Sequence, residues 1–151
     1  YRGLFVLKAF TKMYAIPGIR LGYGITSDKE LIDKMYDAGQ PWNVSVLAQN
    51  AGIAALDEDK FAADTVSLIS KEREFICTNF QRMNIKYWES DANYIFFMHK
   101  KGLKEKLLNR GILIRDCSNY KNLTDGYYRI AIKSHKDNVK LIDALADIDI
   151  N

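Results

Sequence analysis

Short apolar runs and longer amphipathic stretches alternate along the chain, and together they predict a mixed fold of helices and strands. Residues 4–7 form an apolar run that indicates a buried strand leading into a polar turn at Thr11 and Lys12. A proline and a glycine then break the chain, and residues 21–25 indicate a second short strand. The first part of the chain is therefore expected to hold two strands joined by a connection that carries Lys12.

Two helices are predicted next. Ser27 followed by Glu30 forms a capping box, so a helix should begin at Asp28, and Gly39 should end it. A second helix should begin at residue 43 or 45 and run to residue 56.

The third predicted helix is long and amphipathic. Between residues 62 and 83 apolar residues recur at steps of three and four, and Arg73 is the one polar interruption. Lys71, Glu72 and Glu74 fall on the opposite side of this pattern, so all three are expected to face solvent. This helix should connect the first segment to the rest of the chain.

Beyond residue 85 the pattern changes to short elements. It predicts, in order, a strand over residues 94–98, a helix over 103–109, strands over 112–114 and 128–132, and a last helix. Ser134 with Asp137 matches a capping pattern that opens this last helix. The order predicts a small α+β domain with its helices packed on one face of a sheet.

Composition excludes several classes of protein. Hydrophobic residues make up 48% of the 151 residues and charged residues 27%, the profile of a globular protein that is expected to be soluble and cytoplasmic. No apolar run approaches the ~20 residues that cross a bilayer, so no membrane partner is expected. The net charge of +3 is scattered, whereas nucleic-acid binders gather basic residues into a stripe. One short cluster comes near such a stripe and is interpreted as solvated surface: Lys100, Lys101, Lys104 and Lys106.

The cysteines and histidines predict no metal site. Cys77 and Cys117 lack metal-ligand spacing and are expected to be reduced thiols. His99 and His135 have no sequence neighbours that indicate metal binding or a catalytic triad. A structural role is therefore the preferred interpretation for both histidines.

Candidate chemistry is concentrated in the connection after the first strand. Lys12 follows that strand, and Arg20 lies farther along between Gly18 and Gly22. Partial desolvation near a second cation lowers the pKa of a lysine toward the neutral amine, which is the form that makes a Schiff base. Arginine has a planar fork that suits a phosphate dianion, and the glycines allow a close backbone approach. A surface lysine in a loop is the default alternative.

Residues 11–23 resemble the [Ser/Thr]-Lys-x-x-x-x-x-Gly-x-Arg-x-Gly-Tyr signature of fold-type I aminotransferases, in particular the histidinol-phosphate aminotransferase group. The resemblance implies that Lys12 binds pyridoxal 5'-phosphate (PLP) covalently and moves protons at the substrate Cα. It also implies that Arg20 binds the cofactor phosphate, with the Thr11 hydroxyl as a second contact. One departure is Ala9, where many family members have a hydroxyl residue, and this removes one possible phosphate contact.

Further matches extend the resemblance over nearly the whole chain, at residues 41–45, 92–94, 114–120 and 127–132. They imply that Arg129, in the last strand, binds the substrate α-carboxylate. An arginine in an apolar strand is costly without an anionic partner, and an internal Asp or Glu is the alternative partner. Arg115 matches an arginine that holds the substrate phosphate in histidinol-phosphate aminotransferases, and pairing with Asp116 or another carboxylate is an equal alternative.

The resemblance implies an α/β fold in which residues 1–44 end the PLP-binding large domain. Residues 45–151 would form linking helices and the small C-terminal α+β domain of fold-type I PLP enzymes. Family members are more than twice as long, and the chain has no initiator methionine, so we expect a fragment of a longer parent. The upstream half would supply other cofactor contacts. The fragment alone is therefore expected to be inactive and its parent to be a homodimer.

The details favour one branch of the family. The similarity to threonine-phosphate decarboxylases of cobalamin biosynthesis is carried by residues 14–18, 41–44, 112–120, Leu123 and 126–134. The resemblance implies a phosphorylated amino acid or amine as substrate, with L-threonine O-3-phosphate decarboxylation preferred and a histidinol-phosphate or related aminotransferase as the alternative. A non-catalytic α/β binding module is the second alternative. The presence of Lys12, Arg20 and Arg129 together argues against it.

Overall fold

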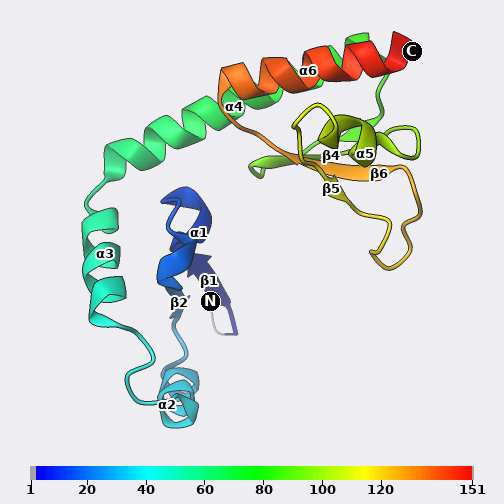
Figure 1. Ribbon diagram of the computed structural model, residues 1–151. Coiled ribbons are helices and arrows are strands. Elements are labelled where there is room, and N and C mark those ends of the chain that lie inside the picture. Colours follow the sequence, from blue (N-terminus) through cyan, green and yellow to red (C-terminus); the bar gives the residue numbers. More distant parts are fainter. Residues whose placement is uncertain (1–2, 151) are drawn as a thin grey trace. The chain divides into compact units, whose positions relative to one another are not determined.

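A computed structural model describes residues 3–150, with side chains described to residue 148. The chain forms two compact units that divide between Thr65 and Val66 (Figure 1). The predicted division of a longer parent into residues 1–44 and 45–151 stays a prediction, and residues 1, 2 and 151 of those ranges lie outside the described residues. In the part of the chain that is described, no helix is long and apolar enough to cross a membrane.

Unit 1 is built on a two-stranded antiparallel sheet. Strands β1 (Phe5–Ala9) and β2 (Gly22–Thr26) pair from one end of each strand to the other. Its other elements are helix α1 (Phe10–Met13), the 3-10 helix η1 (Pro17–Ile19), helix α2 (Lys29–Ala38) and helix α3 (Val46–Leu56). Both predicted strands are thus confirmed, whereas the turn predicted at Thr11 and Lys12 is the short helix α1.

The prediction that the first strand is buried is wrong. All residues of β1 are exposed, and Leu7 has 76% of its surface open to solvent. The physical reason is that β1 pairs only with β2, and among the described residues the buried core of unit 1 is small, with Phe10 and Ala48 as its buried hydrophobic side chains. An apolar run predicts that a segment is buried, but it does not show which other segment buries it.

Capping residues set the helix starts in unit 1. The N-cap of α2 is Asp28, whose Oδ1 accepts a hydrogen bond from the backbone N–H of Leu31 over 3.1 Å. The capping box therefore places the helix correctly, but the cap is one residue later than the predicted Ser27. Ser45, the later of the two predicted start positions, caps α3, since its Oγ accepts from the backbone N–H of Ala48 over 3.2 Å.

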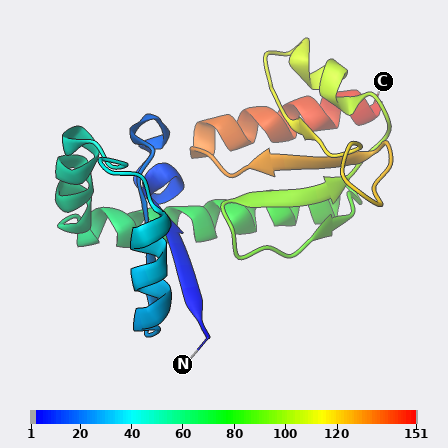
Figure 2. The same cartoon turned by 90° about the horizontal axis from the view of Figure 1, so that it is seen from below.

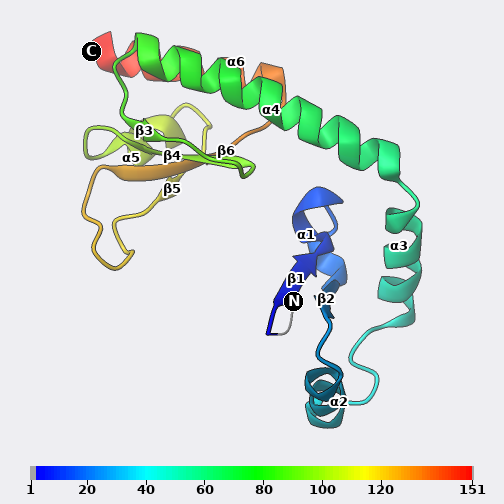
Figure 3. The ribbon, with the colours of Figure 1, turned by 180° about the vertical axis from the view of Figure 1, so that it is seen from behind.

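Unit 2 packs helices on one face of a four-stranded antiparallel sheet whose strand order is β3-β4-β6-β5 (Figures 1 and 2). The strands are β3 (Tyr87–Trp88), β4 (Tyr94–Met98), β5 (Arg115–Asp116) and β6 (Tyr127–Ala131). The helices are α4 (Asp59–Arg82), which begins in unit 1, α5 (Leu103–Leu108) and α6 (His135–Ile150). Figures 1 and 3 show α6 beside the C-terminal part of α4.

Buried and more exposed side chains alternate along the central strands, and the buried ones form part of the core of unit 2. Ile95 and Phe97 of β4 and Tyr128 and Ile130 of β6 are buried against the helices. The helices contribute the remaining buried side chains, among them Ile76, Phe80, Leu103, Leu107, Leu141, Leu145 and Ile148. The predicted α+β arrangement with helices on one sheet face is therefore confirmed.

The strand predicted at residues 112–114 is wrong. These residues form neither helix nor strand, and the backbone N–H of Ile112 donates to the Leu107 carbonyl of α5 over 2.9 Å. Gly111 has φ of +71°, the left-handed conformation that ends many helices. The strand pair begins only at Arg115. Strand β3 was not predicted, because two residues are too few to show a period.

The prediction that Glu72 faces solvent is also wrong, because this residue is buried. Its Oε2 accepts a hydrogen bond from Asn138 Nδ2 over 2.9 Å, and its Oε1 lies 3.1 Å from His135 Nδ1. Asn138 also holds Lys133, through hydrogen bonds to its backbone N–H and carbonyl. Glu72 on α4 therefore anchors the start of α6 and the segment that follows β6. The structural role expected for His135 agrees with this contact.

Replacing Glu72 by alanine is expected to lower the free energy of unfolding by about 1–3 kcal/mol, because it leaves one N–H of the buried Asn138 amide without its acceptor. The hydrogen bond from Asn138, followed by that from His135, lowers the pKa of Glu72 below its ordinary value of 4.5. Its contribution is therefore present above that value and is lost as the pH falls through the lowered folded pKa. Urea unfolding at neutral and acidic pH measures both effects. Glu74→Gln, on an exposed residue of α4, is the control, and an equal loss in both variants would contradict the prediction.

Candidate functional site

The first group of candidate residues lies at one end of the β1–β2 ladder. The last strand pair is Ala9 with Gly22, and the backbone N–H of Phe10 donates to the Leu21 carbonyl over 3.2 Å. Every residue between Phe10 and Leu21 therefore belongs to one closed connection. This connection carries Thr11, Lys12 and Arg20.

Lys12 lies on α1, next to the buried anchor of the connection. Phe10 is only 3% exposed, and its ring stacks on Tyr14 at 5.3 Å between centres. The Lys12 carbonyl accepts from the backbone N–H of Ala15 over 3.3 Å, which fixes the backbone at this position. Its side chain is exposed, so the partial desolvation expected for it is not present, because the core of unit 1 extends only to Phe10.

Arg20 ends η1 in a left-handed conformation with φ of +57°. Such a conformation is uncommon for a residue with a side chain and marks a position that the surrounding structure imposes. One N–H, on Nη1, donates to the Pro17 carbonyl over 3.3 Å, and the rest of the planar fork is exposed. The guanidinium is thus oriented by its own turn while most of its donors stay available.

The two glycines that flank Arg20 behave differently. A Cβ atom at Gly22 would lie 2.8 Å from the Lys8 carbonyl oxygen, so a side chain there would push the strands apart. At Gly18 a Cβ atom would meet nothing within 4 Å. The close backbone approach that was expected at both positions is therefore required only at Gly22.

The donor set of this connection fits PLP. Among residues 3–148 no carboxylate forms an ion pair with Lys12 or Arg20. An amine suits the cofactor aldehyde, and a guanidinium and a hydroxyl both suit its phosphate. Lys12, Arg20 and Thr11 supply these three groups from one short connection of unit 1.

The second group of candidate residues lies on the sheet of unit 2. Arg115 of β5 and Arg129 of β6 are direct partners in the antiparallel ladder. Arg129 lies on the strand face opposite the core, since Tyr128 and Ile130 on either side of it are buried. Like charges in directly opposed positions are destabilising. The pair therefore indicates a place where an anion would be stabilised.

No acidic side chain forms an ion pair with these arginines within the described part of the chain. The Arg129 guanidinium lies 4.8 Å from the centre of the Tyr94 ring, and Arg115 Nη2 donates to Asn119 Oδ1 over 3.0 Å. Asp116 Oδ1 instead accepts from the backbone N–H of Ser118 over 2.8 Å. Hydrogen bonds from Ser118 hold the pKa of Asp116 below its usual range. The internal carboxylate partners considered for Arg129 and Arg115 are thus not found among these residues.

Thr11, Lys12 and Arg20 belong to unit 1, whereas Arg115 and Arg129 belong to unit 2. The structure brings the first three together on one connection and the last two together on one ladder. The sequence did not single out Tyr94 as a neighbour of Arg129. The signal for that contact is the alternation along β4 and β6, which places both side chains on the same sheet face.

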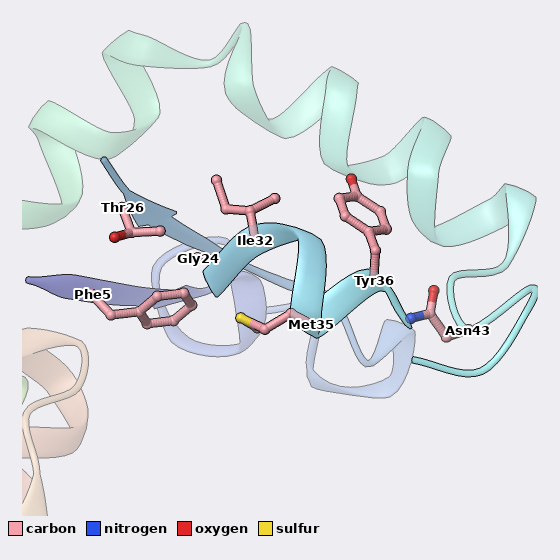
Figure 4. Close-up of a pocket in the computed structure, with 7 residues that line it drawn as sticks. All are labelled: Phe5, Gly24, Thr26, Ile32, Met35, Tyr36 and Asn43. Atoms are coloured by element: carbon pink, nitrogen blue, oxygen red, sulfur yellow. The ribbon is translucent and has the colours of Figure 1, made fainter. Parts of the chain in front are cut away.

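Two pockets lie away from these residues. One in unit 1 has a volume of about 360 Å³ and lies between the strands and α2 (Figure 4). Its lining is apolar with three polar groups, and consists of Phe5, Gly24, Thr26, Ile32, Met35, Tyr36 and Asn43. The other, of about 290 Å³ in unit 2, is lined by residues that include Ile114, Lys133 and Leu141. None of the five candidate residues lines either pocket.

The chain is similar to known proteins of one family over nearly its whole length. The family model described as aminotransferase class I and II matches residues 1–145. The chain is 37% identical over 147 residues to a putative threonine-phosphate decarboxylase of Caldanaerobacter subterraneus subsp. tengcongensis, which covers 94% of the chain and 40% of that protein. It is 32% identical over 155 residues to the histidinol-phosphate aminotransferase of Methanosphaera stadtmanae, with 98% and 42% covered.

Solved structures show the same similarity. The crystal structure of the histidinol-phosphate aminotransferase from Clostridium acetobutylicum superposes with a TM-score of 0.94 at 34% identity. The match covers 100% of this chain and 47% of that structure. The chain therefore spans less than half the length of the relatives it matches.

Proposed function

The chain belongs to the class I and II aminotransferase family, and on that premise we propose that it is the C-terminal part of a longer, homodimeric, cytoplasmic enzyme that uses PLP. Its substrate is a phosphorylated amino acid or amine. Decarboxylation of L-threonine O-3-phosphate is the preferred reaction, and the alternative is amino transfer from histidinol phosphate or a related donor. The chain alone is inactive, because the rest of the parent supplies further contacts to the cofactor.

One observation carries the choice of substrate. Arg115 and Arg129 are opposed in the ladder without a carboxylate partner among the described residues. Two guanidinium groups in this arrangement suit a substrate with two anionic groups. Threonine phosphate has a carboxylate and a phosphate in one molecule. Amino transfer would instead bring histidinol phosphate, with a phosphate only, and then 2-oxoglutarate, with two carboxylates. A single substrate that uses both arginines favours the decarboxylase, and the similarity to a histidinol-phosphate aminotransferase structure keeps the alternative in place.

The roles of the residues follow from their chemistry. Lys12 would hold the cofactor covalently, and Arg20 with Thr11 would bind its phosphate. When bound, PLP supplies an electron sink for the bond that breaks at the substrate Cα. Arg129 binds the substrate carboxylate and Arg115 the substrate phosphate, and together they select which Cα bond is aligned for cleavage. The Lys12 amine then transfers a proton at Cα, either removing it for amino transfer or delivering it after carbon dioxide leaves.

The full-length parent with PLP and O-phospho-L-threonine is expected to release carbon dioxide without any 2-oxo acid. Carbon dioxide release, measured with and without 2-oxoglutarate, separates the two reactions. A matched reaction with L-threonine is the control for the phosphate. Release that is absent, together with amino transfer from histidinol phosphate to 2-oxoglutarate, would replace the decarboxylase with the aminotransferase.

A further inference from the structure

Arg115 is held by neutral groups. Its Nη2 donates to Asn119 Oδ1 over 3.0 Å, and its guanidinium lies 5.5 Å from the centre of the Tyr120 ring. An amide oxygen and an aromatic face both fix the direction of a guanidinium, and neither one cancels its charge. Both partners follow Arg115 in the same turn.

The turn that carries these partners is fixed to the sheet. The backbone N–H of Cys117 donates to the Tyr127 carbonyl over 2.9 Å, and Cys117 is fully buried. Ser118 then donates its backbone N–H to Asp116 Oδ1 over 2.8 Å. The acid next to Arg115 therefore stabilises the turn and forms no ion pair with the guanidinium.

We infer that Asn119 is a positioning residue that makes Arg115 selective for a phosphorylated substrate. This inference rests on the function proposed above. The guanidinium has five N–H donors, and the bond to Asn119 uses only one side of the fork. The remaining donors can form paired hydrogen bonds to a phosphate. A carboxylate in place of the amide would accept the same N–H, but it would neutralise the charge and repel the phosphate.

Asn119→Asp in the full-length parent tests this inference, because it replaces the side-chain amide by a carboxylate of the same size and adds a negative charge beside Arg115. The kcat/KM for O-phospho-L-threonine is expected to fall on the order of 10- to 100-fold, mainly through KM. The inhibition constant for inorganic phosphate should rise in parallel, whereas that for acetate, a probe of the carboxylate side, should change little. Asn119→Ala, which removes the acceptor without adding charge, should give a smaller loss.

Asn122→Asp is the matched control, since it makes the same charge change at an exposed residue later in the same segment. It should keep the wild-type KM. If the wild-type parent does not distinguish O-phospho-L-threonine from L-threonine, the proposed substrate class is wrong. If the wild type does distinguish them and Asn119→Asp and Asn119→Ala both keep its KM and phosphate inhibition within about twofold, the inference about Asn119 is overturned and the proposed function stands.

Discussion

Lys12→Ala in the full-length parent is expected to abolish the absorbance band of lysine-bound PLP and to lower kcat on the order of 10²- to 10⁴-fold or more. The residue supplies both the covalent attachment and the proton transfer at the substrate Cα in the proposed mechanism, so both are lost together. The Lys12 amine is exposed at the end of the β1–β2 ladder. Its removal should therefore leave the fold of unit 1 unchanged.

Lys8→Ala is the matched control for this prediction. Lys8 is an exposed lysine of β1, paired with Tyr23 in the ladder, and it has no role in the proposed chemistry. Borohydride reduction followed by peptide mass analysis should find the cofactor on Lys12 in the wild type and in Lys8→Ala. A modified peptide that contains another lysine, or an unchanged spectrum in Lys12→Ala, would remove Lys12 from its proposed role.

Arg129→Ala should have the second largest effect, a loss of roughly 10- to 100-fold in kcat/KM that arises mainly from weaker substrate binding. Arg129 is half-buried over the Tyr94 ring, and an interaction with solvent access is worth less than a fully buried one. Removal of one of two opposed arginines also relieves repulsion in the ladder. The free energy of unfolding should therefore stay the same or rise slightly.

Arg110→Ala provides the comparison for Arg129. Arg110 is exposed after α5, where its Nη1 donates to the Lys106 carbonyl over 3.3 Å. Steady-state kinetics with a substrate that carries a carboxylate should show a normal KM for Arg110→Ala and a raised KM for Arg129→Ala. Unaltered kinetics in Arg129→Ala would refute the assignment of Arg129 to the carboxylate.

The elements that the sequence predicted correctly are those whose signals are local. Ser45 and Ser134 place the starts of α3 and α6, because the N-cap hydrogen bond joins atoms only a few residues apart. The apolar stripe of α6 likewise predicts its buried face, with Leu141, Leu145 and Ile148 in the core. Such signals depend on one element and its own geometry.

The error at Glu72 occurs where a partner distant in sequence decides the outcome. Glu72 lies within the polar pattern of α4, yet its carboxylate is buried against Asn138 and lies 3.1 Å from His135 of α6. A tertiary contact of this kind leaves no periodic trace in the sequence. The error at residues 112–114 has a local cause, because the backbone N–H of Ile112 donates to the Leu107 carbonyl at the end of α5.

The candidate site also contains residues that a local motif predicts and residues whose arrangement depends on the folded structure. Lys12 and Arg20 are close in sequence and lie on one connection, so a motif can specify them together. The opposition of Arg115 and Arg129 depends on the register of two strands, and the sequence alone does not show that register. The hydrogen bond from Arg115 to Asn119 depends on the direction of the Asn119 side chain, which is a property of the folded turn.

Gly52 of α3 has a consequence for how this region can change over generations. A Cβ atom at that position would lie 2.5 Å from Leu21 Cδ2, so the Leu21 side chain packs directly against the backbone of the helix. Leu21 is the residue that follows Arg20. A larger residue at position 52 can be accepted only together with a smaller or displaced one at position 21. The two positions are therefore expected to vary as a pair among natural sequences, and a helix far along the chain restricts the history of the connection that carries Arg20.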